Sequence, residues 1–215
     1  MGPNRSVRLG ATCLAASALL LTAFPLVRPF ADRSPHPEEV AAAFASPSWV
    51  LAHVLGGLGF VLLPIGLFGV YTFLEGSSGE RRAFQGLILS WIGVGLILPT
   101  VLGTEAFGLR AIGQTAVQQK NPDLLAIANA IRFGRQRMLF FPGLLLLAAG
   151  AISFAAAVWK SNVLPRWSGV LLAAGLALFL PLLPQAIRIV DGFLIGIGGT
   201  WIALSMVSRK GARDI

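Results

Sequence analysis

The chain has 215 residues, of which 55% are hydrophobic and only 12% are charged, whereas soluble domains average about 25% charged residues. This composition predicts a membrane protein. The formal net charge is +8, but the basic residues lie between apolar runs. They therefore indicate membrane topology and contact with lipid headgroups, and we expect no nucleic-acid partner. The single cysteine, Cys13, excludes an intrachain disulfide and a cysteine zinc site.

Six apolar runs divide the chain, each long enough, or nearly so, to cross a bilayer core of roughly 30 Å. Backbone groups in lipid must satisfy one another, and the runs do not alternate as barrel strands do, so we expect helices. The first run follows Arg5 and Arg8 and lacks a convincing cleavage site, so we interpret it as an uncleaved span. The predicted fold is all-α, a polytopic six-transmembrane-helix bundle forming one domain over residues 1–215. Its spans cover about residues 7–27, 49–74, 83–107, 138–159, 164–183 and 186–207.

Two connectors contain predicted short helices. Asn121 precedes a proline and suits the start of a helix over residues 122–133, and the segment "SPHPEEVAAAF" predicts a second one. Ser46 is a predicted N-cap for the second span. We expect both short helices outside the bundle, on the extracytoplasmic side.

The distribution of basic residues predicts the orientation. An even number of spans puts both termini on one side, and the turns on that side hold Arg81, Arg82, Lys160 and Arg166. The positive-inside rule then predicts that both termini lie in the cytoplasm. The connector between the third and fourth spans departs from the rule, because it carries five basic residues on the opposite side: Arg110, Lys120, Arg132, Arg135 and Arg137.

Six uncommon polar residues from four spans fall at about the same depth, near the outer face. Charged groups within a membrane are costly, so they face the bundle interior and find partners. The shared depth predicts a polar pocket that opens outward and binds a ligand, and the alternative is a set of structural salt bridges. The residues are His53, Glu105, Arg110, Arg135, Arg188 and Asp191.

His53 has several interpretations. It is a candidate metal or haem ligand, a candidate proton relay, or a histidine that packs between helices. Together with Glu105 and Asp191 it would supply three ligands to zinc, but the sequence has no HExxH motif and no second histidine in a span. We therefore favour helix packing and expect no metal, no cofactor and no catalytic residue.

Three segments resemble small bacterial six-helix membrane proteins of a family without a settled activity. They read "HPEEVAAAFASPSWVLAHVLGGLGF", "NVLPRWSGVLLAAG" and "RIVDGFLIGIGGTW". The resemblance covers nearly the whole chain and implies six spans in a bacterial inner membrane, but it implies no mechanism.

These observations favour a protein that binds or transports a small amphiphile, a lipid or an anion through the outer pocket. Its expected partners are membrane lipid and a small-molecule ligand, and the oligomeric state stays open. One alternative is an accessory subunit whose charges only hold helices together. Another is a membrane-embedded enzyme that uses Glu105 or Asp191 as a general base with His53 beside it.

Overall fold

A computed structural model of the chain describes residues 5–135, 137–180 and 183–211. These residues form helices joined by short connections, and no strand occurs among them. The short elements are η1 (Phe30–Arg33), the π-helical segment η2 (Pro99–Gly108) and η3 (Pro122–Leu124). The α-helices are α1 (Arg5–Val27), α2 (Pro37–Ala45), α3 (Pro47–Leu74), α4 (Glu80–Leu98), α5 (Leu109–Gln119), α6 (Leu125–Arg132), α7 (Arg137–Ser161), α8 (Arg166–Leu178) and α9 (Gln185–Gly211).

Within the described residues, five helices are long enough and apolar enough to span a membrane, which indicates a membrane protein. They are α1, α3, α7, α9 and the continuous helix made of α4, η2 and α5. The fifth predicted run, 164–183, forms only the 13-residue helix α8. At 1.5 Å per residue, α8 is about 20 Å long, which is shorter than the roughly 30 Å core. The predicted sixth crossing of the membrane is therefore not confirmed, and Pro181, at the end of this run, lies outside the described residues.

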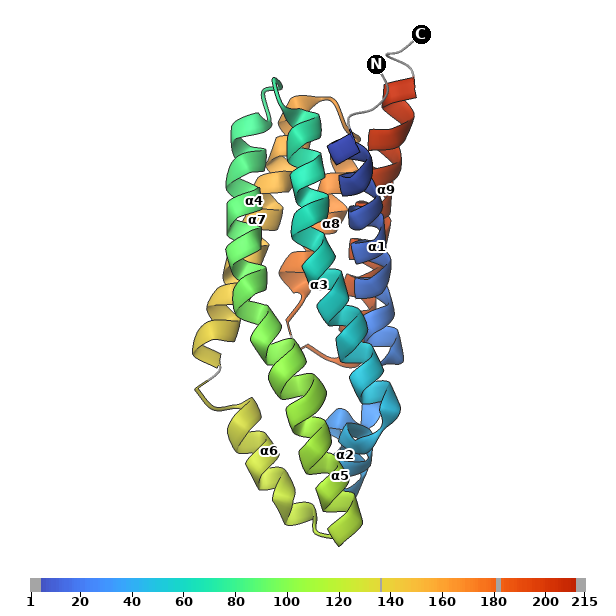
Figure 1. The fold of residues 1–215 in the computed structure, drawn as a ribbon, viewed down its shortest axis with the longest axis vertical. Helices are drawn as coiled ribbons and strands as arrows, with labels where there is room; N and C mark the ends of the chain where they lie inside the picture. Colours follow the sequence, from blue (N-terminus) through green and yellow to red (C-terminus); the bar gives the residue numbers. More distant parts are fainter. Residues whose placement is uncertain (1–4, 136, 181–182, 212–215) are drawn as a thin grey trace.

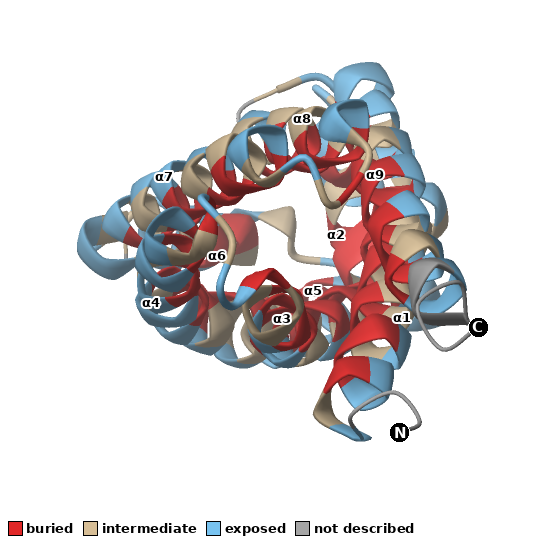
Figure 2. Cartoon of the chain, turned by 90° about the horizontal axis from the view of Figure 1, so that it is seen from above, coloured by how far each residue is buried: buried red, intermediate tan, exposed pale blue. Residues whose placement is uncertain are grey.

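Six helices form a closed ring. Each packs against the next in the order α1, α3, α4, α7, α8 and α9, and α9 returns to α1. Figure 2 shows the ring from above, with the buried residues turned inward. Helices α1 and α3 pack closely, since a Cβ at Gly69 would lie 2.5 Å from Gly10 Cα. Two glycines therefore let the backbones of these helices touch, as small residues do in membrane helix pairs.

The third span extends well beyond its predicted end at residue 107. The helix runs from Glu80 to Gln119, and its 40 residues span roughly 60 Å, more than the thickness of a bilayer. A proline is expected to kink or end a helix, and Pro99 lies within this one. Instead the helix widens into π turns from that residue onward, which accommodates the missing proline N–H without ending the helix. Lys120 ends it in the left-handed conformation, with a φ of 50°.

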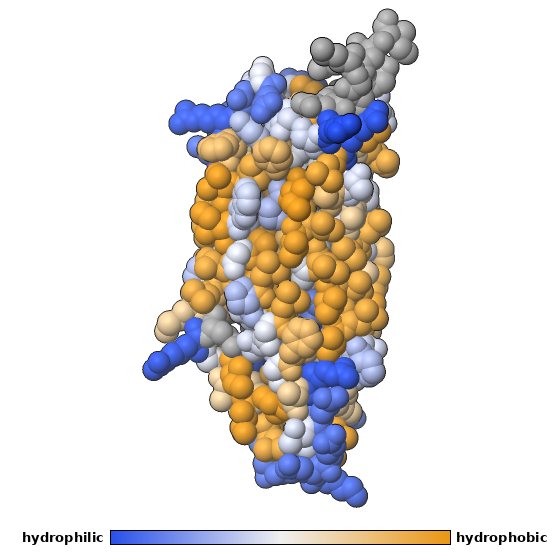
Figure 3. All heavy atoms as spheres, viewed as in Figure 1, coloured by the Kyte–Doolittle hydropathy of each residue, from blue (hydrophilic) through white to orange (hydrophobic). Residues whose placement is uncertain are grey.

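Three helices at one end of the ring form a cap, defined here as α2, α5 and α6. The cap has its own small core, in which Phe44 and Trp49 pack with Leu109 and Leu125. Ser46 begins α3 beneath α2 as expected, because its hydroxyl accepts a hydrogen bond from the Trp49 backbone N–H at 3.2 Å. In Figure 1 the cap lies at the bottom, opposite the ends of α1 and α9 that lead to the termini. On the face drawn in Figure 3, an apolar belt surrounds the ring between two hydrophilic bands, and the cap extends past the lower band.

Candidate functional site

A cavity of about 860 Å³ lies between the capped end of the ring and the cap itself. Its wall takes residues from α1, η1, α2, α3, η2, η3, α6, α7 and α9. Phe179 and Leu180 line it directly after α8 ends. Because α8 ends at Leu178, the space beyond its end, between α7 and α9, forms part of the cavity.

The charged groups of the wall nearly balance. Five arginines and four carboxylates line the cavity, so their formal charges differ by a single unit. The arginines are Arg28, Arg33, Arg132, Arg137 and Arg188, and the acids are Asp32, Asp123, Glu105 and Asp191.

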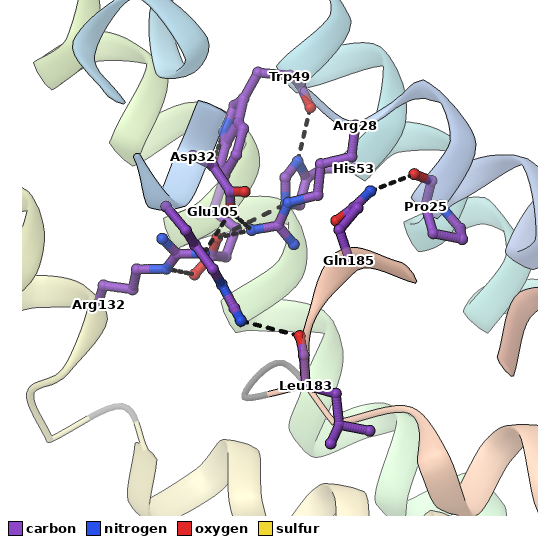
Figure 4. A network of polar contacts seen from close by, with 10 residues as sticks. Pro25, Arg28, Asp32, Trp49, His53, Glu105, Arg132, Leu183 and Gln185 are labelled. Atoms are coloured by element: carbon purple, nitrogen blue, oxygen red, sulfur yellow. Dashed lines mark hydrogen bonds and ion pairs between the residues drawn. The ribbon is translucent and has the colours of Figure 1, made fainter. Parts of the chain in front are cut away.

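Four of these groups form a closed ion-pair network between the ring and the cap (Figure 4). Arg28, just after α1, approaches Asp32 Oδ2 at 2.6 Å and Glu105 Oε2 at 3.7 Å. Arg132, the last residue of α6, approaches the same two carboxylates, with its Nη2 3.3 Å from Asp32 Oδ2 and its Nε 3.0 Å from Glu105 Oε1. Two guanidinium groups thus meet two carboxylates, and Arg132 ties the cap to the end of α1 and to η2.

Arg28 depends strongly on these partners. Its side chain is 5% exposed, and burial lowers the pKa of its guanidinium while the carboxylates of Asp32 and Glu105 oppose that shift. The guanidinium carbon also lies 4.7 Å from the centre of the Trp49 ring, a favourable cation–π distance. The buried cation is therefore compensated on two sides.

Trp49 and His53, both on α3, lie beside the network. The indole N–H of Trp49 donates to the Glu105 backbone carbonyl, which fixes η2 against α3. One turn later, His53 Nδ1 lies 2.7 Å from the Trp49 carbonyl, so Nδ1 carries the proton and Nε2 is the free acceptor nitrogen. His53 Nε2 lies 3.7 Å from Glu105 Oε2, and neither atom has a hydrogen-bond partner among the described residues.

Arg188 and Asp191 stand apart from the network. Both lie in the first two turns of α9, and only 5% of Arg188 and 1% of Asp191 is exposed. Both terminal nitrogens of Arg188 and both carboxylate oxygens of Asp191 lack a hydrogen-bond partner within residues 5–135, 137–180 and 183–211. Buried charges without partners are rare, because leaving them uncompensated is costly.

Seven phenylalanines also line the cavity. Phe179 packs edge-to-face on Phe60 at 5.2 Å between ring centres and also contacts Phe24 at 5.8 Å. Phe140 and Phe141 add a further pair from α7, 6.0 Å apart. The cavity is therefore amphipathic, because both charged groups and aromatic rings line it.

The structure brings four of the six predicted site residues to this wall and leaves two outside it. His53, Glu105, Arg188 and Asp191 line the cavity. Arg110 is not in the wall, because it points back to α3 and donates to the Ser46 carbonyl at 3.1 Å. Arg135 is exposed and does not line the cavity.

Three residues of the network were missed by the sequence analysis, namely Arg28, Asp32 and Arg132. Arg28 and Asp32 are four residues apart directly after the first span, a spacing that suits an ion pair. Arg132 belongs to the connector whose basic charge contradicted the positive-inside rule. That contradiction was the available signal, but it did not distinguish Arg132 from Arg135.

The candidate zinc ligands do not assemble. Among the described residues, no three His, Cys, Asp or Glu side chains are grouped closely enough to hold a metal ion. The protein comparisons add no relative: no protein-family model, no curated protein and no solved structure matches the chain. The resemblance to bacterial six-helix membrane proteins therefore rests on its apolar motifs.

Proposed function

We propose that this protein binds or transports a small amphiphile through the cavity beneath the cap. The observation that carries the proposal is the amphipathic wall, in which buried charges and aromatic rings enclose one space of about 860 Å³. A volume of this order suits a ligand of drug-like size, since such pockets measure about 300–1,000 Å³. A small anion would not contact the phenylalanines of the wall, so an amphiphile fits the cavity better than an anion does.

The proposal includes six spans, with α8 as the short one. Its neighbours in the ring, α7 and α9, are both of membrane length, and α8 packs between them. A helix in that position lies within the same apolar belt. We propose a bacterial inner membrane as its location, with both termini in the cytoplasm and the cap outside, in keeping with the basic turns before α4 and α8.

The test is ligand-induced stabilisation of the purified protein. A series of single-chain amphiphiles is added to protein held in a maltoside detergent, and Tm is measured. At a hundred times Kd, a specific ligand stabilises by about 2.7 kcal/mol, and for a chain of this size each kcal/mol raises Tm by roughly 2–4 °C. The stabilisation should disappear when Phe179→Asp places a charge on the aromatic wall. An unchanged Tm across the whole series would refute the proposed function.

A second candidate, a membrane-embedded enzyme, is favoured by one observation. His53 Nε2 and Glu105 Oε2 lie 3.7 Å apart, and both are lining residues. Such a pair is suited to move a proton during general acid–base catalysis. Mass spectrometry of the amphiphile recovered after incubation separates the two functions, because binding or transport returns it unchanged and an enzyme does not.

A further inference from the structure

The unpaired charges of the cavity identify the class of head group that it selects. The ion-pair network satisfies Arg28 and Arg132 with Asp32 and Glu105. It therefore presents little net charge to a ligand. Of the five other charged lining residues, Arg188 and Asp191 are the two that are more than nine-tenths buried and have side-chain atoms without a hydrogen-bond partner in the described part of the chain. These two side chains line the same cavity.

Their positions on α9 bring them within reach of one small ligand. Residues three apart on a helix share a face, with Cβ atoms about 5–6 Å apart. Arg188 and Asp191 have this spacing, yet no ion pair joins them. The guanidinium offers two free N–H donor groups and the carboxylate offers two free acceptor oxygens. A ligand carrying both charges a short distance apart would satisfy both side chains at once.

We propose that the cavity selects a zwitterionic amphiphile with a phosphoethanolamine-like head. Its anionic group binds the Arg188 guanidinium, its ammonium group binds the Asp191 carboxylate, and its apolar part lies against Phe140, Phe141 and Phe179. This inference rests on the proposed function of the cavity as an amphiphile site. A purely anionic head would satisfy Arg188 but leave Asp191 buried, uncompensated and close to a like charge, which is costly. A neutral sugar head would supply hydroxyl groups but no counter-charge to either side chain.

The experiment compares two probes that share one acyl chain. Lysophosphatidylethanolamine carries the zwitterionic head and lysophosphatidylglycerol carries the anionic one. Each is titrated into the full-length protein in maltoside detergent, and an apparent Kd is obtained by native mass spectrometry. The wild-type protein should bind the zwitterionic probe at least about tenfold more tightly, since a hydrogen-bonded charge pair contributes roughly that much or more.

Two substitutions assign the preference to the pair. Asp191→Asn should abolish the tenfold preference by weakening the zwitterionic probe and strengthening the anionic one. Arg188→Gln should weaken both probes about tenfold or more, and Arg188→Lys should restore part of the affinity. The matched controls are Arg135→Gln and Glu75→Gln, which change exposed residues outside the cavity wall and should leave both values unchanged.

The outcomes separate the two proposals. If the anionic probe binds the wild-type protein as tightly as the zwitterionic probe, the head-group inference is overturned while amphiphile binding stands. If Asp191→Asn keeps the full preference, Asp191 is not the ammonium site and the inference is likewise overturned. If neither probe binds, the proposed function fails together with the inference. The wild-type comparison decides the selectivity even if a variant does not fold.

Discussion

Two groups of buried charge share the cavity wall and differ in how they are compensated. Asp32 and Glu105 each lie within ion-pair distance of two arginines, so the charges of the network balance without a ligand. Arg188 and Asp191 have no such partners among the described residues. The first group therefore holds the cap on the ring, while the second is available for recognition. The two groups should respond differently to mutation.

Arg132→Ala should destabilise the protein. The substitution removes one cation from two carboxylates, and the side chains of Arg132 and Glu105 are 12% and 15% exposed. Charged hydrogen bonds of this kind contribute about 1.5–3 kcal/mol, so Tm should fall by roughly 3–12 °C for a chain of this size. Differential scanning fluorimetry in detergent provides the measurement. The control is Arg135→Ala, which replaces an exposed arginine three residues away and should change Tm little. An equal fall in Tm for both variants would contradict the role of Arg132 in holding the cap on the ring.

At the residue scale, the sequence predicted the depth of a residue along its span better than the direction in which its side chain points. Counting residues along each span placed His53, Glu105, Arg188 and Asp191 near one level, and all four line the cavity. The same count included Arg135, which faces solvent. Depth follows from the rise of a helix, but the direction of a side chain after a span depends on how the connector folds, and that is decided by tertiary packing.

The helices themselves were largely predictable, because hydrophobic runs of this length form helices in lipid. Two ends were not. The third span continues into the polar helix α5, which sits on the cap core through Leu109 and Ala116, so it needs no apolar run of its own. Helix α8, in the fifth predicted span, ends at Leu178 even though the apolar sequence continues. Hydropathy measures which residues tolerate lipid, and it does not report where a helix ends.

Gly69→Ala should weaken the packing between α1 and α3. Alanine usually favours a helix over glycine by up to about 1 kcal/mol, but here its Cβ would meet the Gly10 backbone at 2.5 Å. Overpacking of this kind costs about 1–3 kcal/mol, so Tm should fall despite the better propensity. Gly95→Ala on α4 is the matched control, because a Cβ there meets nothing within 4 Å. Equal Tm values for the two variants would show that α1 and α3 can move apart at Gly69 without a loss of stability.

At the scale of the whole molecule, the proposed topology puts the α3–α4 turn and the cap on opposite faces of the membrane. Ser78 in that turn and Gln118 in α5 are both exposed. In a Cys13→Ala background, Gln118→Cys should react with a membrane-impermeant maleimide added outside spheroplasts. Ser78→Cys should react only after the membrane is opened. The reverse pattern would invert the orientation, and labelling of both sites from outside would argue against a spanning ring.

The central claim is that a single amphiphile occupies the space between ring and cap, and photo-crosslinking tests it most directly. A lysophosphatidylethanolamine with a diazirine in its acyl chain is bound to the detergent-purified protein and irradiated, and the labelled peptides are mapped by mass spectrometry. The predicted label falls on the aromatic wall at Phe140, Phe141 and Phe179, and it decreases when unlabelled probe competes. Label confined to lipid-facing residues such as Leu145 and Leu204, which are 70% and 67% exposed, and undiminished by competitor, would contradict the claim.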